Sequence, residues 1–175
     1  LLDYVKQVGG TDMVKRYEES APITRFHRQQ SVMTPMAQRR DHWAALTTWW
    51  MFPTKNGLDR ATAQFPMLLE ERLDDLGIDF AILYPTEGLI LPVIGDPELR
   101  RVACRAVNMY MAETLGPYSH RMTPVAQIAN HTPEEAVEDL EFAVQTLGFK
   151  AVVFSGYVVR PVPRVARDYP KAAGY

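Results

Sequence analysis

Four polar side chains that could take part in chemistry follow the ends of three apolar segments: Tyr84, Thr86, His131 and Ser155. Hydroxyl and imidazole groups can both donate and accept hydrogen bonds, so they are suited to binding a small polar substrate. If the three segments are parallel strands, these residues lie at the carboxyl ends, where α/β proteins bind their ligands. We therefore take them as candidates for a substrate pocket.

His131 has two interpretations. Its imidazole could carry a proton near neutral pH, or it could fasten the loop in which it lies by hydrogen bonds. The other histidines are His27, His42 and His120, and none of the four has the HxH or HExxH spacing of metal ligands. The sequence therefore predicts no metal site made by this chain alone.

A helix, a glycine and a strand follow one another in the first apolar unit. Leucines recur at helical spacing over residues 68–76, and Gly77 comes directly after them. Glycine adopts positive φ without the penalty that a Cβ atom brings, so the chain can turn there. The apolar run at 78–84 is then predicted to be a strand.

Two further strands are predicted near 122–129 and 150–155, each after a helical pattern. The later one again follows a Leu-Gly pair, at positions 147 and 148. Strands that alternate with helices predict a parallel sheet, and strands that are apolar on both faces predict a sheet that is covered on each side. The predicted fold class is α/β, with parallel strands near 78–84, 122–129 and 150–155.

The helices carry a few polar positions of interest. A clean apolar stripe predicts a helix over 97–115. Asn108 in this helix is expected to fasten it to a loop, and Cys104 lies off the stripe and is expected to be an inert thiol. Thr132 and Glu135 have the spacing of a capping box, which predicts that a helix begins there.

The chain divides into three parts by its patterns. Residues 1–60 are predicted to be a helical and irregular excursion rich in aromatic side chains, residues 61–160 hold the three αβ units, and residues 161–175 form a proline-rich loop that leads out of them. Within the first part, two short helices broken at Gly9-Gly10 are expected over residues 1–20.

Trp50 lies in the most aromatic segment, at 42–53. Tryptophan prefers sites where its ring is covered while its N–H keeps a partner. The segment could therefore pack against the main body or form a subunit interface, which makes a homodimer plausible. Alternatively, Trp50 could form an aromatic wall of the substrate pocket.

Composition excludes several classes of function. The formal net charge of −2 gives no field that would attract nucleic acid or an anionic membrane, so neither is expected as a partner. No apolar run is long enough to cross a membrane. The single cysteine fits a reducing compartment, and a cytoplasmic location is expected.

Three successive stretches together resemble the amidohydrolase-related proteins, which include aminocarboxymuconate-semialdehyde decarboxylase. The stretches are ERLDDLGIDFAILYPTEGL, then DPELRRVACRAVNMYMAETLGPYSHRMTPVAQI, then HTPEEAVEDLEFAVQTLGFKAVVF, and the resemblance covers roughly residues 58–160. The resemblance implies a partial (β/α)8 TIM barrel, in which the three predicted strands are the second, third and fourth.

The resemblance also implies a divalent metal, usually zinc, and a small-molecule substrate. The family holds its metal with an HxH pair on the first strand, histidines on the fifth and sixth strands and an aspartate on the eighth, and none of these can be assigned to a position here. The chain is thus expected to be part of a metal-dependent hydrolase or carboxy-lyase that acts on a small aromatic or unsaturated carboxylic acid. Alone, this part is expected to be inactive and to bind no metal.

Hydrolysis and decarboxylation remain open alternatives. A non-catalytic α/β interaction module, or an inactive barrel fragment, is the other interpretation. A nucleotide-binding domain is disfavoured because no G-x-G-x-x-G or P-loop follows a strand.

Overall fold

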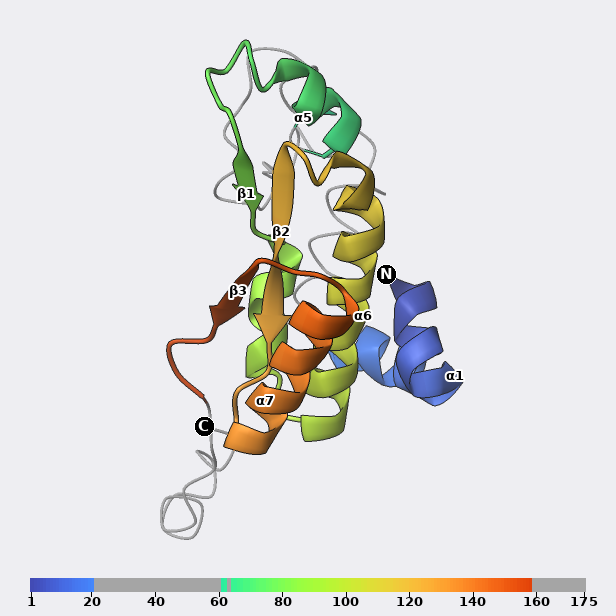
Figure 1. Cartoon of the computed structure of the whole chain (residues 1–175). Coiled ribbons are helices and arrows are strands. Elements are labelled where there is room, and N and C mark those ends of the chain that lie inside the picture. Colours follow the sequence, from blue (N-terminus) through green and yellow to red (C-terminus); the bar gives the residue numbers. More distant parts are fainter. Residues whose placement is uncertain (21–60, 63, 159–175) are drawn as a thin grey trace, which may run out of the picture.

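A computed structural model describes residues 1–20, 61–62 and 64–158 of the chain. Trp50, most of the aromatic excursion and the proline-rich loop at 161–175 lie outside the described residues. Three strands, β1 (Ala81–Leu83), β2 (Met122–Ile128) and β3 (Ala151–Phe154), form one parallel sheet in the order β1-β2-β3 (Figure 1). The predicted α/β fold is confirmed. The sheet is open, and the described residues do not close it into a barrel.

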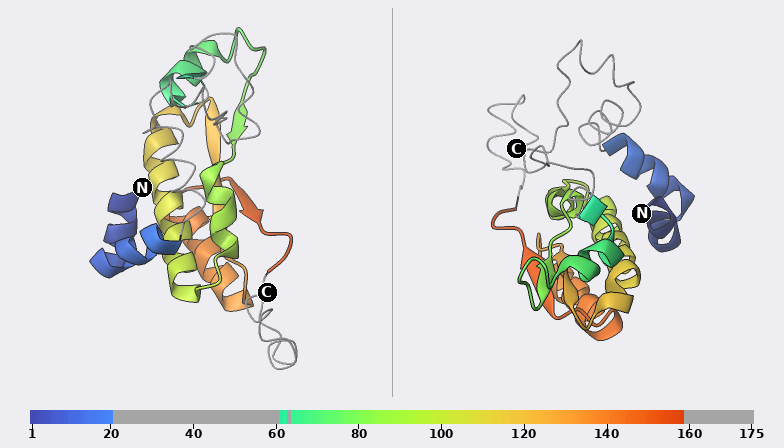
Figure 2. Two further views of the ribbon diagram at one scale, coloured as in Figure 1. Left: turned by 180° about the vertical axis from the view of Figure 1, so that it is seen from behind. Right: turned by 90° about the horizontal axis from the view of Figure 1, so that it is seen from above.

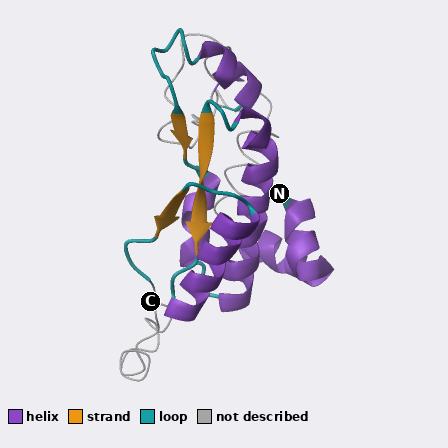
Figure 3. Cartoon of the chain, in the orientation of Figure 1, coloured by secondary structure: helices purple, strands orange, loops and turns teal. Residues whose placement is uncertain are grey.

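Helical segments connect the strands. The chain passes from β1 through the 3₁₀ turns of η2 (Glu87–Val93) and the long α6 (Pro97–Leu115), with η3 (Gly116–Tyr118), to β2. From β2 it passes through α7 (Pro133–Glu141) and a π-helical turn, η4 (Phe142–Thr146), to β3. Figure 3 shows these helices gathered beside the strands.

The central strand β2 pairs with its two neighbours over different halves of its length. Ala81 to Leu83 of β1 lie opposite Met122 to Pro124, and β3 lies opposite Val125 to Ile128. The carboxyl end of β1 is therefore four residues short of the carboxyl end of β2. At about 3.3 Å per residue, this offset is roughly 13 Å along the strand.

One face of the sheet carries the helices. Met122 packs with Leu115 and Leu73, while Ala126 and Ile128 pack with Ala143. Because side chains alternate along a strand, these even-numbered residues of β2 point to the helical face, and the odd-numbered ones point to the other.

Only β2 is buried as the sequence predicts. Its residues are buried or half-buried throughout, whereas Ile82 of β1 is 56% exposed and Phe154 of β3 is 47% exposed. The prediction that all three strands are covered on both faces is wrong for β1 and β3. The apolar run before β1 is also exposed, at Ile78 and Phe80.

The first helix, α1 (Leu2–Ser20), packs against α6 and away from the sheet, as the two views of Figure 2 show. It bends at Gly10, which has φ of 81°, so the predicted break at Gly9-Gly10 is confirmed. Arg16 donates to the carboxylates of Asp96 and Glu98 and so ties α1 to the start of α6. No helix among the described residues is long and apolar enough to cross a membrane.

The helix before β1 is shorter than predicted. α5 (Pro66–Arg72) begins with Pro66 in its first turn, where the missing N–H costs nothing, and a turn follows from Leu73 to Gly77. Leu73 is buried, but Leu76 is 51% exposed, so Leu76 is not part of the buried stripe that was expected.

Gly77 and Gly148 have φ of 69° and 72°, as their place between helix and strand predicts. Replacing Gly148 with alanine is expected to lower the free energy of unfolding by about 1 kcal/mol, because L-residues are strained at positive φ. Gly116→Ala is the matched control, since Gly116 has φ of −50° and open space around it. Equal effects of the two substitutions in urea denaturation would contradict this.

Candidate functional site

The carboxyl ends of β2 and β3 are joined by a side chain between them. Nδ2 of Asn130 donates to the carbonyl oxygen of Ser155 at 3.2 Å. His131 follows Asn130 directly and is 8% exposed. Two of the predicted site residues, His131 and Ser155, therefore lie at neighbouring strand ends.

The hydroxyl of Ser155 is already engaged. Oγ donates to the carbonyl oxygen of Tyr157 at 2.5 Å and forms a tight turn after β3. A serine that acts as a nucleophile needs a base to take its proton. Among the described residues, this hydroxyl donates to a backbone carbonyl and not to a base, so Ser155 is better suited to shaping the loop than to attack.

Tyr84 and Thr86 are not brought to His131. They follow β1, which ends opposite Pro124, well before the carboxyl end of β2. Tyr84 is 58% exposed and Thr86 is also exposed. The sequence places all four residues at strand ends correctly, but the register of β1 against β2 separates them into two pairs.

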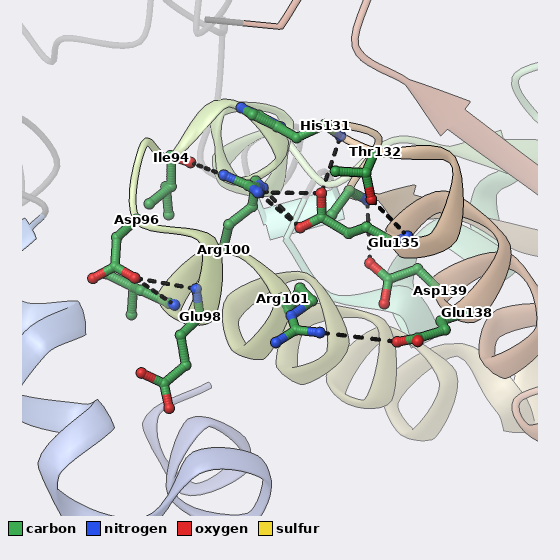
Figure 4. Close-up of polar contacts among 12 residues, drawn as sticks. Ile94, Asp96, Glu98, Arg100, Arg101, His131, Thr132, Glu135, Glu138 and Asp139 are labelled. Carbon is green, nitrogen blue, oxygen red and sulfur yellow. Dashed lines mark hydrogen bonds and ion pairs between the residues drawn. The ribbon is translucent and has the colours of Figure 1, made fainter. Parts of the chain in front are cut away.

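A buried ion pair lies beneath the loop that carries His131 (Figure 4). Arg100 of α6 donates from Nε to Oε1 of Glu135 at 2.9 Å and from Nη2 to Oε2 at 3.1 Å. Both side chains are less than one tenth exposed. The third nitrogen of Arg100, Nη1, donates to the carbonyl oxygen of Ile94 at 2.7 Å.

Glu135 also holds the backbone of the loop. Its Oε2 accepts from the N–H of His131 at 3.0 Å, and its own N–H donates to Oγ1 of Thr132 at 3.2 Å. The predicted cap at Thr132 is confirmed. The carboxylate, however, reaches back to His131 and to Arg100 rather than to the N–H of Thr132, which a capping box would require. The ion pair therefore joins α6, the backbone at Ile94 before the helix begins and the loop of His131.

Sequence reasoning missed the role of Arg100. A signal was present, because Arg100 stands next to Leu99 and two residues before Val102 in the apolar pattern of α6. Arginine is almost never fully buried without a partner. Which acid pairs with it could not be read from the sequence, because Glu135 lies 35 residues away.

Asp139 is a second buried acid on α7, at 1% exposure. It accepts from the N–H of Ala129 and from Nε of Arg105, both at 3.2 Å. Burial raises the pKa of its carboxyl group above the ordinary value, and the two hydrogen bonds lower the pKa by less. Asp139 therefore fixes the end of β2 to α7.

The raised pKa of Asp139 predicts a pH dependence of stability. A carboxyl whose folded pKa is raised contributes stability fully below its unfolded pKa, near 3.8, and loses it as pH rises through the folded pKa. The unfolding free energy of the wild type, relative to Asp139→Asn, is thus expected to fall as pH rises from about 4 toward neutrality. A rise measured by urea titration would mean that the bond to Arg105 outweighs burial.

Asn108 and Cys104 are both buried on α6. Nδ2 of Asn108 donates to the carbonyl oxygen of Gln127 at 2.9 Å, and its Oδ1 accepts from the N–H of Gln127 at 2.8 Å. Asn108 fastens the helix to β2, not to a loop as predicted. Cys104 packs in a core cluster with Leu91 and Ala129, so its placement off the apolar stripe is wrong. Burial raises the pKa of its thiol, which disfavours the reactive thiolate.

The described residues do not fit a metal site. No group of three or more His, Cys, Asp or Glu side chains in that part of the chain lies close enough to hold an ion. The two buried acids of α7 are each engaged by an arginine. His27 and His42 lie outside the described residues.

Two hollows lie at the amino end of the sheet, away from His131. An open apolar groove of about 450 Å³ lies between the start of α5 and the end of α6, lined by Phe65, Pro66, Met67, Leu68, Thr114 and Tyr118. A smaller one of about 80 Å³ lies near the start of β2 and the Gly148 turn. In α/β folds this end contributes to stability, so neither hollow is a candidate active site.

No family model matches the sequence, and no curated protein or solved structure is significantly similar to it.

Proposed function

We propose that this chain is an arc of a (β/α)8 barrel from a metal-dependent hydrolase or carboxy-lyase that acts on a small aromatic or unsaturated carboxylic acid. One observation carries the proposal: three parallel strands follow one another in chain order, with the helices on one face. Right-handed crossovers without a reversal of strand order place their helices on the same side, as around a barrel. A doubly wound sheet, in contrast, has helices on both faces.

The face without helices supports the same proposal. Ile82 and Tyr84 alternate with Ala81 and Leu83, which pack on the helical face. Ile82 and Tyr84 are 56% and 58% exposed, so an apolar surface stands open on the side that would line a barrel. Further strands would pair with the outer edges of β1 and β3, which have no other neighbour among the described strands, and would cover this surface.

The metal of the proposed enzyme would not be held by the described residues. We therefore assign no chemical step to them and give them a supporting part. His131 and the exposed side chains of Tyr84 and Thr86 would contribute to the wall of a substrate pocket, and the Arg100–Glu135 pair would fix the loop of His131. We also propose a cytoplasmic location.

The test begins with the coding sequence on both sides of this segment. An HxH motif before it, and a later histidine and aspartate in helix–strand units after it, are expected. The protein so encoded should bind about one zinc per chain by elemental analysis. It should also release CO₂ from, or hydrolyse an ester or amide of, an aromatic acid.

In that protein, His131→Gln is expected to lower kcat/KM by about tenfold, the effect of one lost polar contact. Glu138→Gln on the exposed side of α7 is the control. If the protein binds zinc but His131→Gln leaves kcat/KM unchanged, His131 is not part of the substrate pocket.

A non-catalytic interaction module is the second candidate. The observation that favours it is the exposed apolar edge of the sheet, at Phe80 and Ile82 on one side and Phe154 on the other. Exposed strand edges pair with other chains. Absence of the flanking motifs, together with a concentration-dependent dimer in sedimentation, would favour this candidate over the enzyme.

A further inference from the structure

We propose that the apolar groove between the start of α5 and the end of α6 is the docking site of residues 42–53 of this same chain, with Trp49 and Trp50 as the side chains that enter it. The segment reads HWAALTTWWMFP and lies outside the described residues. The inference does not rest on the proposed function, because it concerns the amino end of the sheet and not the carboxyl end.

The groove has room for large side chains. Its volume is about 450 Å³, and it is open to solvent. Phe65 and Met67 in its wall are 57% and 54% exposed. Apolar surface removed from water stabilises a protein by about 25 cal/mol per Å², so an apolar segment that fills this groove gains free energy.

The chemistry of the wall suits tryptophan. A tryptophan is most stable where its ring is covered and its N–H has a partner. None of the groove residues is charged, and two of them, Thr114 and Tyr118, carry hydroxyl groups that can accept a hydrogen bond from an indole N–H. Residues 42–53 contain no Asp, Glu, Lys or Arg, so docking would bury none of these charges.

The chain returns to the described residues beside the groove. Oγ1 of the buried Thr62 accepts from Nη1 of Arg72 in α5 at 2.6 Å, and the N–H of Phe65 donates to the carbonyl oxygen of Ala61 at 2.8 Å. The point of return is therefore fixed to α5. Phe52 comes about ten residues earlier, and a stretch of that length spans at most roughly 35 Å, so the segment remains close to the groove.

This short connection favours the chain's own segment over a second copy of the chain. A group that is joined to its site by a short stretch of chain acts at an effective concentration of the order of millimolar. A second copy would need a similar concentration in solution to compete. Trp50 then lies at the end of the sheet opposite His131 and takes no part in a substrate pocket.

The experiment uses the 175-residue chain, in which Trp43, Trp49 and Trp50 are the only tryptophans, so tryptophan fluorescence reports on this segment alone. The emission is expected to lie to the blue of that of the urea-unfolded chain and to be protected from quenching by acrylamide. Met67→Glu places a charge in the groove and is expected to shift the emission to the red and to remove the protection. Leu76→Glu is the matched control, because Leu76 is 51% exposed but does not line the groove.

A fluorescent label locates the tryptophans. Bimane is quenched by tryptophan in contact with it, and it can be attached to the Glu71→Cys variant, because Glu71 is exposed on α5 one turn after Met67, whereas Cys104 is 0% exposed. The label is expected to be quenched. The quenching should be lost when Trp49 and Trp50 are both replaced with leucine, and also when Met67→Glu is added.

Two results would overturn the proposal. Tryptophan emission that Met67→Glu leaves unchanged, or a label that is not quenched, would show that the segment does not dock in this groove. Quenching that increases with protein concentration would assign the groove to a second copy instead. Met67 and Leu76 are both exposed, so the variants are expected to fold, which circular dichroism checks. Failure here would leave the barrel proposal intact, because that proposal depends on the flanking motifs and zinc.

Discussion

Replacing Glu135 with glutamine is expected to lower the free energy of unfolding by about 3 kcal/mol or more, because it leaves the charge of Arg100 buried and uncompensated. Glutamine keeps the shape of glutamate, so the loss reports on the charge and not on packing. Arg100 is only 4% exposed in its side chain and cannot turn to solvent without breaking its bond to Ile94. Urea denaturation measures the effect, with the same dependence of the unfolding free energy on urea concentration in the variant and the wild type.

Glu138→Gln on the same helix is the matched control. Glu138 is 57% exposed and lies 3.9 Å from Arg101 and Arg105, so its ion pairs are weak. A change within about 0.5 kcal/mol is expected for it. If Glu135→Gln costs no more than this control, the ion pair does not hold the loop, and the support that we assign to His131 fails with it.

Replacing Asn108 with leucine is expected to cost about 3 kcal/mol, since two buried backbone groups of Gln127 lose their partners at about 1–3 kcal/mol each. Leucine has the same number and branching of side-chain heavy atoms as asparagine and favours helix more strongly, so neither a cavity nor helix propensity explains the loss. The amide hydrogen of Gln127 should also exchange faster with solvent in the variant than in the wild type. Hydrogen exchange therefore gives a local readout beside denaturation.

Met109→Leu, one residue further along α6, is the control for the helix itself. Met109 is half-buried, and this volume-conserving change is expected to cost less than about 1.5 kcal/mol. It should leave the exchange of Gln127 unchanged. If Asn108→Leu destabilises the protein without faster exchange at Gln127, the side chain contributes through α6 and not through β2.

Both predictions concern polar groups that join α6 to the second αβ unit. Arg100 near the start of the helix meets the loop after β2, and Asn108 in its middle meets β2 itself. Arg105 lies between them and meets Asp139. Polar contacts at three levels of one helix fix the rotation of α6 against the sheet more narrowly than apolar packing alone would.

The sequence by itself determined the local elements, because their signals are short in range. Glycine at 77 and 148 must turn the chain, Thr132 must cap α7, and the run from Met122 to Ile128 must be a covered strand. Alternation of helix and strand was enough to predict a parallel sheet. Each of these depends on residues a few positions apart.

Only the tertiary structure decided what depends on distant residues. The register of β1 against β2 separates Tyr84 from His131, and no local pattern encodes that register, since it depends on which residues of two distant segments come to lie opposite one another. The exposure of Ile82 and Phe154 depends on which surfaces find a neighbour. Arg100 pairs with Glu135, which lies 35 residues further along the chain. The Gln127 side chain packs near Gly88, which lies 39 residues before it. Charge and hydrogen bonding stabilise such contacts only after folding has brought the two residues close together.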